Sequence, residues 1–355
     1  MAARECREEN EIEYNTYDQT VDIVSCWESF LNHSYTGVFG DYHFDRFPTL
    51  SGDSAELTPD FAVTVTSEYG LIGEIKRTFP DDDTPFKRTL EQLARYDEPD
   101  QLQASDDRML APDTVDLLLL IKGTAAPQIG IRIQRLLESG ELSLDRNLVV
   151  VRYQYNTRDQ RSRYEFQRVT AVEDEFRDGA LRDEHALSTH MGKAADYQTL
   201  PVYPKHFHSE KVKKPICNDK PPEQYLATIL WHKIFPAFLS DADYSAWQSG
   251  SAQKTISIQV TPGLVTTELN SYMRDGRARK TWVKDALIFL KDADLAERHG
   301  DSFEIKFRGF VRNIGTDNDQ EGTEELDKLE TLGETFIQRY CHYTASDSES
   351  LESYE

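Results

Sequence analysis

The sequence predicts a mixed α/β domain followed by a second, mainly helical domain. Two continuous apolar runs, residues 115–121 and 147–155, have the length and composition of strands that are covered on both faces of a sheet. A proline-rich, weakly periodic connector at residues 171–220 separates these runs from a later group of helical patterns. At 355 residues, of which 38% are hydrophobic, the chain is long enough for two cores.

Helical and strand patterns alternate in the first domain, which we expect to span residues 1–170. Apolar residues at helical spacing predict helices, and short runs rich in β-formers predict strands. The expected helices cover residues 20–32, 85–96 and 127–138, and the expected strands lie within residues 36–47, 61–66, 71–76, 115–121 and 147–155.

Residues 61–66 and 71–76 predict a β-hairpin, because both runs alternate in polarity. Residues 68–70 suit a three-residue loop with glycine in the left-handed position, which pairs Ser67 with Leu71. Side chains alternate with period two, so one face is almost wholly apolar and the other is polar. The apolar face carries Phe61, Val63, Val65, Leu71, Gly73 and Ile75, and the polar face carries Asp60, Thr64, Glu74, Lys76 and Thr78.

The polar face has the residue types that metal-dependent hydrolysis of a phosphodiester requires. Carboxylates such as Asp60 and Glu74 hold Mg²⁺, a hard cation that prefers oxygen ligands and keeps several waters. The metal acidifies a bound water and neutralises the oxyanions, and a lysine such as Lys76 orients the nucleophile or binds the phosphate. The alternative is a surface hairpin with an acid–base ladder, because Pro-Asp and Glu-x-Lys each occur often by chance.

Pro59-Asp60 followed by Glu74-Ile75-Lys76 resembles the signature of the PD-(D/E)XK nuclease superfamily. The resemblance covers about residues 20–169 and implies a restriction-endonuclease-like mixed sheet flanked by helices. It also implies a Mg²⁺-dependent deoxyribonuclease in which Mn²⁺ can substitute. Asp60, Glu74 and the Ile75 carbonyl would then bind the metal, and Lys76 would position the attacking water.

Gln92 and Tyr96 lie four residues apart on the expected helix after the motif, and therefore on one face. This spacing resembles the Q-x-x-x-Y element of the RecB-like branch of the superfamily, which implies a catalytic role in supporting the phosphate or a metal-bound water. An ordinary exposed helix face is the alternative.

The superfamily usually adds an acidic metal ligand from its first helix. Glu28 is the best candidate, because it falls on the polar side of residues 20–32. Asp22, Asp41 and Asp45 compete with it, and Glu28 is equally well read as a solvated carboxylate.

The second domain, residues 221–312, reads as a helix, a short strand, two further helices, a glycine-containing turn and a final strand. The expected elements are helices at residues 222–239, 262–273 and 280–290, with Thr261 as an N-cap, and strands at residues 255–260 and 303–307. This order resembles a winged helix, whose third helix enters the major groove of DNA. Protein docking is the alternative. The expected DNA-binding residues are Arg277, Arg279, Lys280 and Lys284.

The acidic C-terminal segment, residues 313–355, contains an apolar stripe at helical spacing. We expect this helix to pack on the same chain, with pairing to a second copy as the alternative, and residues 345–355 to be disordered. The stripe consists of Leu326, Leu329, Leu332, Phe336 and Tyr340.

The four cysteines are far apart in the sequence and predict reduced thiols, not a disulfide or a zinc site. The first residues are charged and no run of eighteen apolar residues exists, so we expect a cytoplasmic protein without a membrane span.

The predicted function is a metal-dependent DNA endonuclease in prokaryotic antiviral defence, as in the Shedu group, or in mobile-element processing. Its partner is DNA, and a homo-oligomer or an accessory protein is compatible with this role. A net charge of −23 opposes phosphate binding and favours the alternative, a nuclease-fold scaffold protein that no longer cuts.

Overall fold

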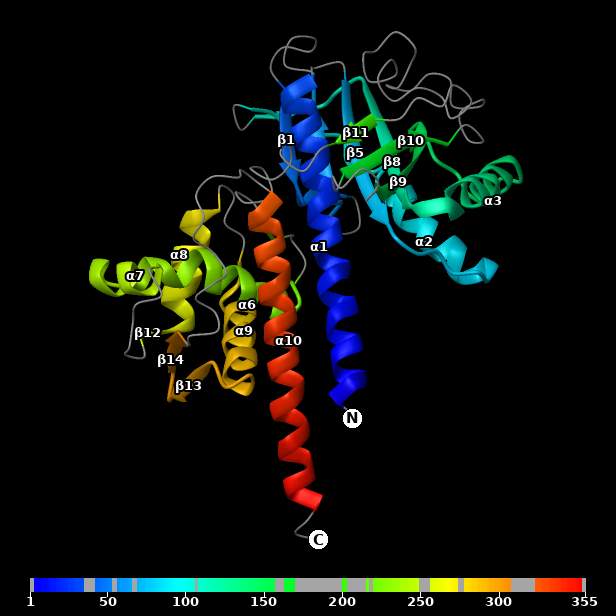
Figure 1. Cartoon of the computed structure of the whole chain (residues 1–355). Helices are drawn as coiled ribbons and strands as arrows, with labels where there is room; N and C mark the ends of the chain where they lie inside the picture. The colour runs from blue at the N-terminus through cyan, green and yellow to red at the C-terminus, as the bar shows by residue number, and fades with distance from the viewer. Residues whose placement is uncertain are drawn as a thin grey trace. The chain divides into compact units, whose positions relative to one another are not determined.

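The computed structural model describes most of the chain, in two compact units (Figure 1). One unit, the sheet unit, spans Ile23–Phe207, and the other, the helical unit, joins Met1–Asp22 to His208–Glu355. Compared with the expected domain of residues 1–170, the sheet unit begins and ends later in the chain. The described residues are 3–34, 42–52, 56–65, 69–105, 108–156, 163–169, 200–202, 215–216, 220–248, 256–273, 278–307 and 323–352.

The sheet unit contains a seven-stranded mixed sheet in the order β1-β4-β5-β8-β9-β10-β11. The three central strands β5, β8 and β9 run parallel, and the strands on both sides of them pair antiparallel. The predicted mixed α/β sheet is thus present. The strands are β1 His43–Arg46, β4 Phe61–Thr64, β5 Tyr69–Lys76, β8 Thr114–Lys122, β9 Leu148–Asn156, β10 Arg163–Arg168 and β11 Leu200–Val202.

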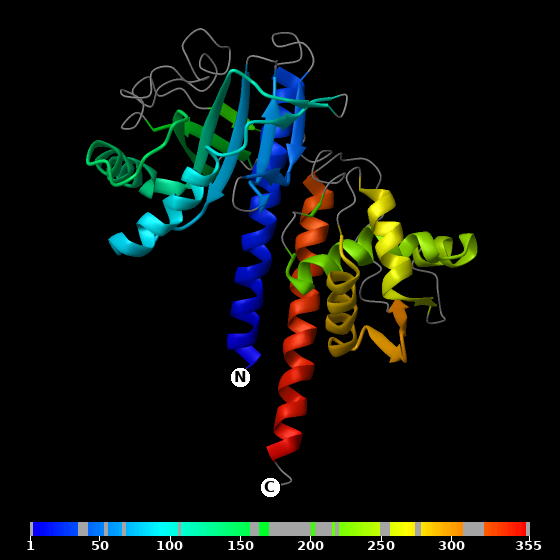
Figure 2. The ribbon, with the colours of Figure 1, turned by 180° about the vertical axis from the view of Figure 1, so that it is seen from behind.

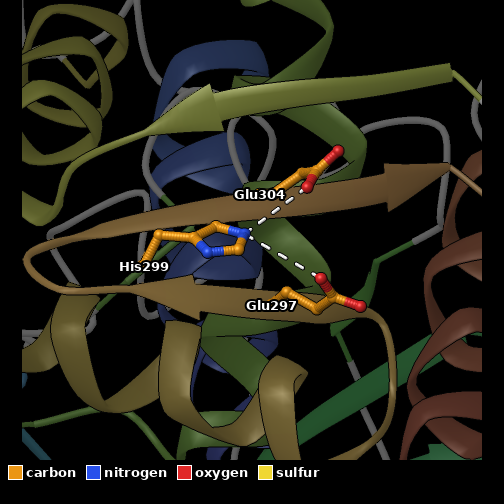
Figure 3. Close-up of side chains that lie close together, drawn as sticks. All are labelled: Glu297, His299 and Glu304. Atoms are coloured by element: carbon orange, nitrogen blue, oxygen red, sulfur yellow. Dashed lines mark ion pairs between the residues drawn. The ribbon is translucent and has the colours of Figure 1, made fainter.

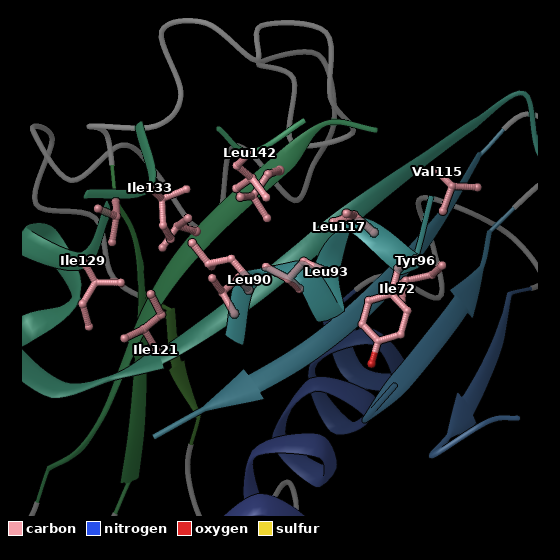
Figure 4. Close-up of a cluster of buried hydrophobic side chains, with 14 of the residues drawn as sticks. Ile72, Leu90, Leu93, Tyr96, Val115, Leu117, Ile121, Ile129, Ile133 and Leu142 are labelled. Carbon is pink, nitrogen blue, oxygen red and sulfur yellow. The ribbon is translucent and has the colours of Figure 1, made fainter. Parts of the chain in front are cut away.

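Helices cover both faces of this sheet (Figures 1 and 2). On one face, α2 (Asp83–Arg95) and α3 (Ala126–Glu138) pack on alternate residues of β5, β8 and β9 and form the apolar cluster of Figure 4. On the other face, Trp27 of α1 (Ala3–Ser34) stacks on Phe61 of β4. Because the central strands are covered on both faces, they consist mainly of apolar residues.

Smaller elements connect the main ones. Two short hairpins, β2 with β3 and β6 with β7, precede and follow the β4–β5 pair. A single 3₁₀ turn, η1, links β8 to α3. Their bounds are β2 Leu50–Ser51, β3 Glu56–Leu57, β6 Leu102–Gln103, β7 Met109–Leu110 and η1 Gly123–Ala125.

The β4–β5 hairpin has the predicted faces but a different register. Phe61 pairs with Gly73 and Thr64 with Gly70, a shift of four residues from the expected pairing, and Tyr69 and Gly70 belong to β5 and not to the loop. Gly70 serves close packing, because a Cβ there would lie 2.6 Å from Leu102 Cδ1. The even shift preserves the two faces.

Strand β11 corrects the interpretation of residues 171–220 as a connector alone. Tyr164 and Phe166 of β10 pair with Val202 and Leu200, so the chain returns to the edge of the sheet. Most of this segment lies outside the described residues.

In the helical unit, three strands form an antiparallel sheet in the order β12-β14-β13, and helices cover one face of it. The N-cap prediction is confirmed, because Thr261 Oγ1 accepts a hydrogen bond from Leu264 N at 3.3 Å. Helix α7 and strand β13 were not predicted. The elements are α6 Glu223–Ile229, a π turn η5 Leu230–Ile234, a 3₁₀ turn η6 Phe235–Phe238, α7 Asp241–Gln248, β12 Ile256–Val260, α8 Pro262–Tyr272, α9 Lys280–Asp292, β13 Ala296–His299, β14 Ser302–Phe307 and α10 Thr323–Glu352.

Helix α10 packs on α6 and α9, as the apolar stripe predicts. Leu329, Leu332 and Phe336 are buried, and the Tyr340 ring stacks on Phe289 at 4.7 Å. The helix continues to Glu352, so the expected disorder from residue 345 is wrong for most of that stretch.

A disulfide joins Cys6 of α1 to Cys341 of α10, which overturns the prediction that all cysteines are reduced thiols. The two residues are 335 positions apart, and only the pairing of the two helices brings them together. Tyr14 strengthens this pairing, because its hydroxyl donates to Leu329 O at 3.2 Å. Cys26 is buried and belongs to no disulfide, and Cys217 lies outside the described residues. Among the described helices, none is long and apolar enough to cross a membrane.

Candidate active site

Four polar side chains from β5 and α2 form one connected network. Glu74 and Lys76 lie on the face of β5 that carries Ile72, and this face packs under α2. Gln92 and Tyr96 lie four residues apart at the C-terminal end of α2 and point to the same strand. The structure therefore brings together residues that the sequence separates by up to 22 positions.

Glu74 is the centre of the network and is 5% exposed. Its Oε1 accepts hydrogen bonds from Lys76 Nζ at 2.6 Å and Gln92 Nε2 at 3.0 Å, and its Oε2 accepts one from Tyr96 OH at 2.7 Å. Gln92 also accepts from Lys76 Nζ at 2.9 Å and donates to Tyr96 OH at 3.0 Å. A buried carboxylate is costly unless it is paired and hydrogen-bonded, and this network supplies both kinds of partner.

Asp60 lies immediately before β4 and is half-buried. Its Oδ2 accepts a hydrogen bond from Ile75 N at 2.7 Å. Because Phe61 pairs with Gly73, the observed register places Asp60 beside Glu74, whereas the expected register would have placed it beside Thr78. The register correction therefore brings the two carboxylates closer together.

Tyr96 remains a hydrogen-bond donor over the whole physiological pH range. Burial raises the pKa of its phenol well above the ordinary value, and the charge of Glu74 raises this pKa further. Its ring belongs to the apolar cluster, and its hydroxyl points away from that cluster (Figure 4). The protonated phenol can thus hold one oxygen of Glu74 in place.

Two arginines contact α2, one at each end, and no sequence pattern predicted either. At the N-terminal end, Arg132 of α3 lies 3.8 Å over the Phe86 ring and pairs with Asp83 at 2.9 Å. At the C-terminal end, Arg146 Nη1 donates to Tyr96 O at 2.7 Å. Arg146 is distant in sequence from the motif, and only the folded chain brings its guanidinium group to the carbonyl of Tyr96. The two contacts restrain the helix that carries Gln92 and Tyr96.

Tyr153 of β9 is a further residue near the site that was not predicted. Burial raises the pKa of its phenol, Arg77 lowers it, and Asp60 raises it. The available sequence signal for this part of the site was Arg77, the basic residue that directly follows the Glu-x-Lys motif.

The structure places Glu28 in a buried ion pair with Arg46 of β1. No described hydrogen bond links Glu28 to the network of Glu74. Its alternatives Asp22 and Asp45 are buried as well, and Asp41 lies outside the described residues.

The oxygen-rich donor set around Asp60 and Glu74 fits a hard divalent cation. Each carboxylate oxygen has two acceptor sites, so the hydrogen bonds to Glu74 leave acceptor capacity. Ile75 lies beyond the last paired residue of β4, so its amide donates to the Asp60 side chain. In a strand, the N–H and C=O of one residue point to the same side. The carbonyl of Ile75 is therefore directed to the side of Asp60, as a metal ligand there requires.

The cations expected to bind DNA belong to the helical unit, on and before α9. Arg279, Lys280 and Lys284 are exposed, while Val283 and Leu287 bury the opposite side of the helix. Asp285, which would dilute the positive charge, pairs with Lys220 at 2.8 Å. Arg277 lies outside the described residues.

Comparison with known proteins adds no assignment to this geometry: no family model, no curated protein and no solved structure matches the chain.

Proposed function

We propose that this protein is a metal-dependent deoxyribonuclease of the PD-(D/E)XK type. The observation that carries the proposal is the closed network of Glu74, Lys76, Gln92 and Tyr96, with Asp60 beside it. Chance occurrences of Pro-Asp, Glu-x-Lys and Q-x-x-x-Y have no reason to converge from a loop, a strand and a helix.

In this proposal Asp60, Glu74 and the Ile75 carbonyl hold Mg²⁺, and Mn²⁺ can substitute for it. The bound cation supplies an acidified water and charge neutralisation at the scissile phosphate. Lys76, whose Nζ lies between Glu74 and Gln92, orients the attacking water as a compact point charge. Gln92 and Tyr96 fix the orientation of the Glu74 carboxylate, which is the ligand that must not rotate.

An open groove of about 700 Å³ beside α2 and α3 offers a path for the substrate backbone. Arg88 lines it and lies one turn before Gln92 on the same side of α2. Lys87, Arg132 and Arg135 also line the groove, together with Asp83, Glu91 and Glu141. Lys87 pairs with Glu141 and Arg132 with Asp83, so Arg88 and Arg135 are the groove cations offered to DNA that leaves the site along α2.

In the helical unit, the order α6, α7, β12, α8, α9, β13 and β14 resembles that of a winged helix with one additional helix, α7. We propose that α9 contacts duplex DNA through Arg279, Lys280 and Lys284, with Arg277 just before them. The setting that suits such an enzyme is prokaryotic antiviral defence or mobile-element processing in the cytoplasm, with a homo-oligomer or an accessory protein to restrain it.

The test is a cleavage assay with supercoiled and linear DNA in Mg²⁺ or Mn²⁺. The parent is expected to cut, Lys76→Ala is expected to be inactive, and the matched variant Lys291→Ala, which removes a surface lysine paired with Asp292, is expected to cut like the parent. Asp60→Asn is expected to abolish cleavage with little change in the melting temperature without metal. Cleavage by Lys76→Ala at the parental rate would remove the catalytic assignment.

A nuclease-fold scaffold that no longer cuts is the second candidate, and one observation favours it. The net charge of −23 weakens attraction to DNA phosphates. The same assay separates the two, because a scaffold leaves supercoiled and linear DNA intact with either metal.

A further inference from the structure

The outer face of the β12-β14-β13 sheet carries three side chains that converge on one point, separate from the proposed nuclease site in sequence and in unit. They are Glu297 and His299 of β13 and Glu304 of β14 (Figure 3). One ligand atom from each lies within 4.8 Å of the others. Glu297 and His299 are exposed and Glu304 is half-buried, so an ion reaches the cluster from solvent without any rearrangement.

The pairing of the two strands places two of the carboxylates opposite each other. Glu297 lies directly opposite Glu304 across the antiparallel pair, and like charges in this position destabilise a sheet. Lys306 compensates in part, because its Nζ pairs with Oε1 of Glu297. The second oxygen of Glu297, Oε2, instead faces His299.

Both distances from His299 are longer than a good hydrogen bond, and the shorter one matches the spacing of ligands around one ion. His299 Nε2 lies 3.9 Å from Glu297 Oε2 and 3.5 Å from Glu304 Oε2. Good N–H···O bonds are about 2.7–3.2 Å long. Ligand atoms around a tetrahedral zinc ion lie about 3.3–3.6 Å apart, because metal–ligand bonds of about 2.0–2.2 Å meet at the tetrahedral angle.

A neighbouring hydroxyl holds one of the ligands in place. The Ser257 hydroxyl of β12 is a hydrogen-bond partner of the Glu304 carboxylate. Residues that orient a ligand by hydrogen bonding are a regular part of metal sites.

We propose that Glu297, His299 and Glu304 bind a transition-metal ion of the zinc class, with a solvent-facing fourth position. The imidazole ligand separates this site from the proposed nuclease site, whose donors are oxygen atoms. Imidazole suits zinc, copper and nickel, whereas Mg²⁺ prefers oxygen ligands alone. The bound ion would link the two strands of the β13–β14 hairpin and offer its open position to a solvent or partner ligand.

The test is a zinc titration by calorimetry of the full chain, freed of metal and held in excess Mg²⁺ so that oxygen-only sites are already filled. The parent is expected to bind one zinc ion that His299→Ala and Glu304→Gln each weaken about tenfold or more. The matched control is His342→Ala, which removes an exposed histidine of α10 and is expected to bind zinc like the parent. All three substitutions are at accessible positions, and far-UV circular dichroism verifies that each variant is folded.

The proposal is overturned if the parent takes up no zinc, if His299→Ala binds zinc as tightly as the parent, or if His342→Ala weakens binding to the same degree. None of these results depends on DNA cleavage, so the nuclease proposal and the zinc proposal fail separately.

Discussion

Replacement of Tyr96 by phenylalanine removes one oxygen atom from the centre of the proposed active site and leaves the apolar packing of the ring intact. The lost hydroxyl donates to Glu74 Oε2 at 2.7 Å and accepts from Gln92 Nε2 at 3.0 Å. Hydrogen bonds to charged groups contribute about 1.5–3 kcal/mol, and Glu74 is too deeply buried for water to replace the donor easily. We therefore expect Tyr96→Phe to lower the free energy of unfolding by about 2 kcal/mol.

This loss is large enough to be measured in the melting temperature and in urea titrations. A domain of about 150–250 residues loses roughly 2–4 °C per kcal/mol, so the variant should melt about 4–8 °C below the parent. The measurement is made without divalent metal, so that any change in metal affinity does not contribute to the difference.

The difference between the two proteins should shrink at alkaline pH. The pKa of Tyr96 is raised in the folded state, so its stabilising contribution is complete below the unfolded pKa of about 10 and is lost as pH rises above that value. The loss amounts to about 1.4 kcal/mol per pH unit, and the phenylalanine variant does not experience it. At about pH 11 the difference should therefore fall below about 1 kcal/mol.

Two results would refute this reasoning. A difference near zero at neutral pH would show that the hydroxyl does not support Glu74. A difference that stays constant between neutral and alkaline pH would show that the Tyr96 phenol titrates alike in the folded and unfolded chains.

Three further predictions concern other parts of the chain. Gly73→Ala should destabilise the protein by about 1–3 kcal/mol in urea unfolding, because the new Cβ would lie 2.1 Å from the Phe61 ring, which is held by Trp27; an unchanged midpoint would show that the ring moves freely. Cys6→Ser should cost about 2–4 kcal/mol in non-reducing conditions and nothing in the presence of reductant, and equal stability in both conditions would contradict the disulfide. Lys280→Glu with Lys284→Glu should weaken duplex binding and flatten its salt dependence, whereas unchanged retention in a gel shift would favour protein docking by α9.

The hairpin faces were predictable from the sequence, but the strand register was not. Period-two alternation determines which residues share a face, and any even shift preserves it, so Asp60, Glu74 and Lys76 were placed on the correct side. The loop length depends on Gly70, which is equally suited to a turn and to close packing against Leu102. Sequence alone does not separate these two uses of glycine.

Helix positions were predicted well where one apolar face is continuous, as in α2, α3 and α9. The predicted start of helix α1 was too late, because residues 3–19 have few apolar positions. Part of this stretch is buried only by long-range contacts, such as that of Tyr14 with α10. The short strand β13 has three exposed residues out of four, so it carries no alternation to detect.

Glu74, Gln92 and Tyr96 could be assigned to one site because their spacing resembles a known motif. Arg132 and Arg146, which restrain α2 at both ends, could not be assigned, because each is an isolated arginine whose partners are backbone carbonyls and a distant carboxylate. The Cys6–Cys341 pair was missed for the same reason, since proximity in space leaves no local pattern in the sequence.

The link between Cys6 and Cys341 also closes nearly the whole polypeptide into a covalent ring. A protease that cuts once anywhere between these residues would open the ring without releasing a fragment, and both pieces would migrate together until a reductant is added. Damage to an internal loop would therefore leave the two parts of the molecule tethered, with the opportunity to reassociate.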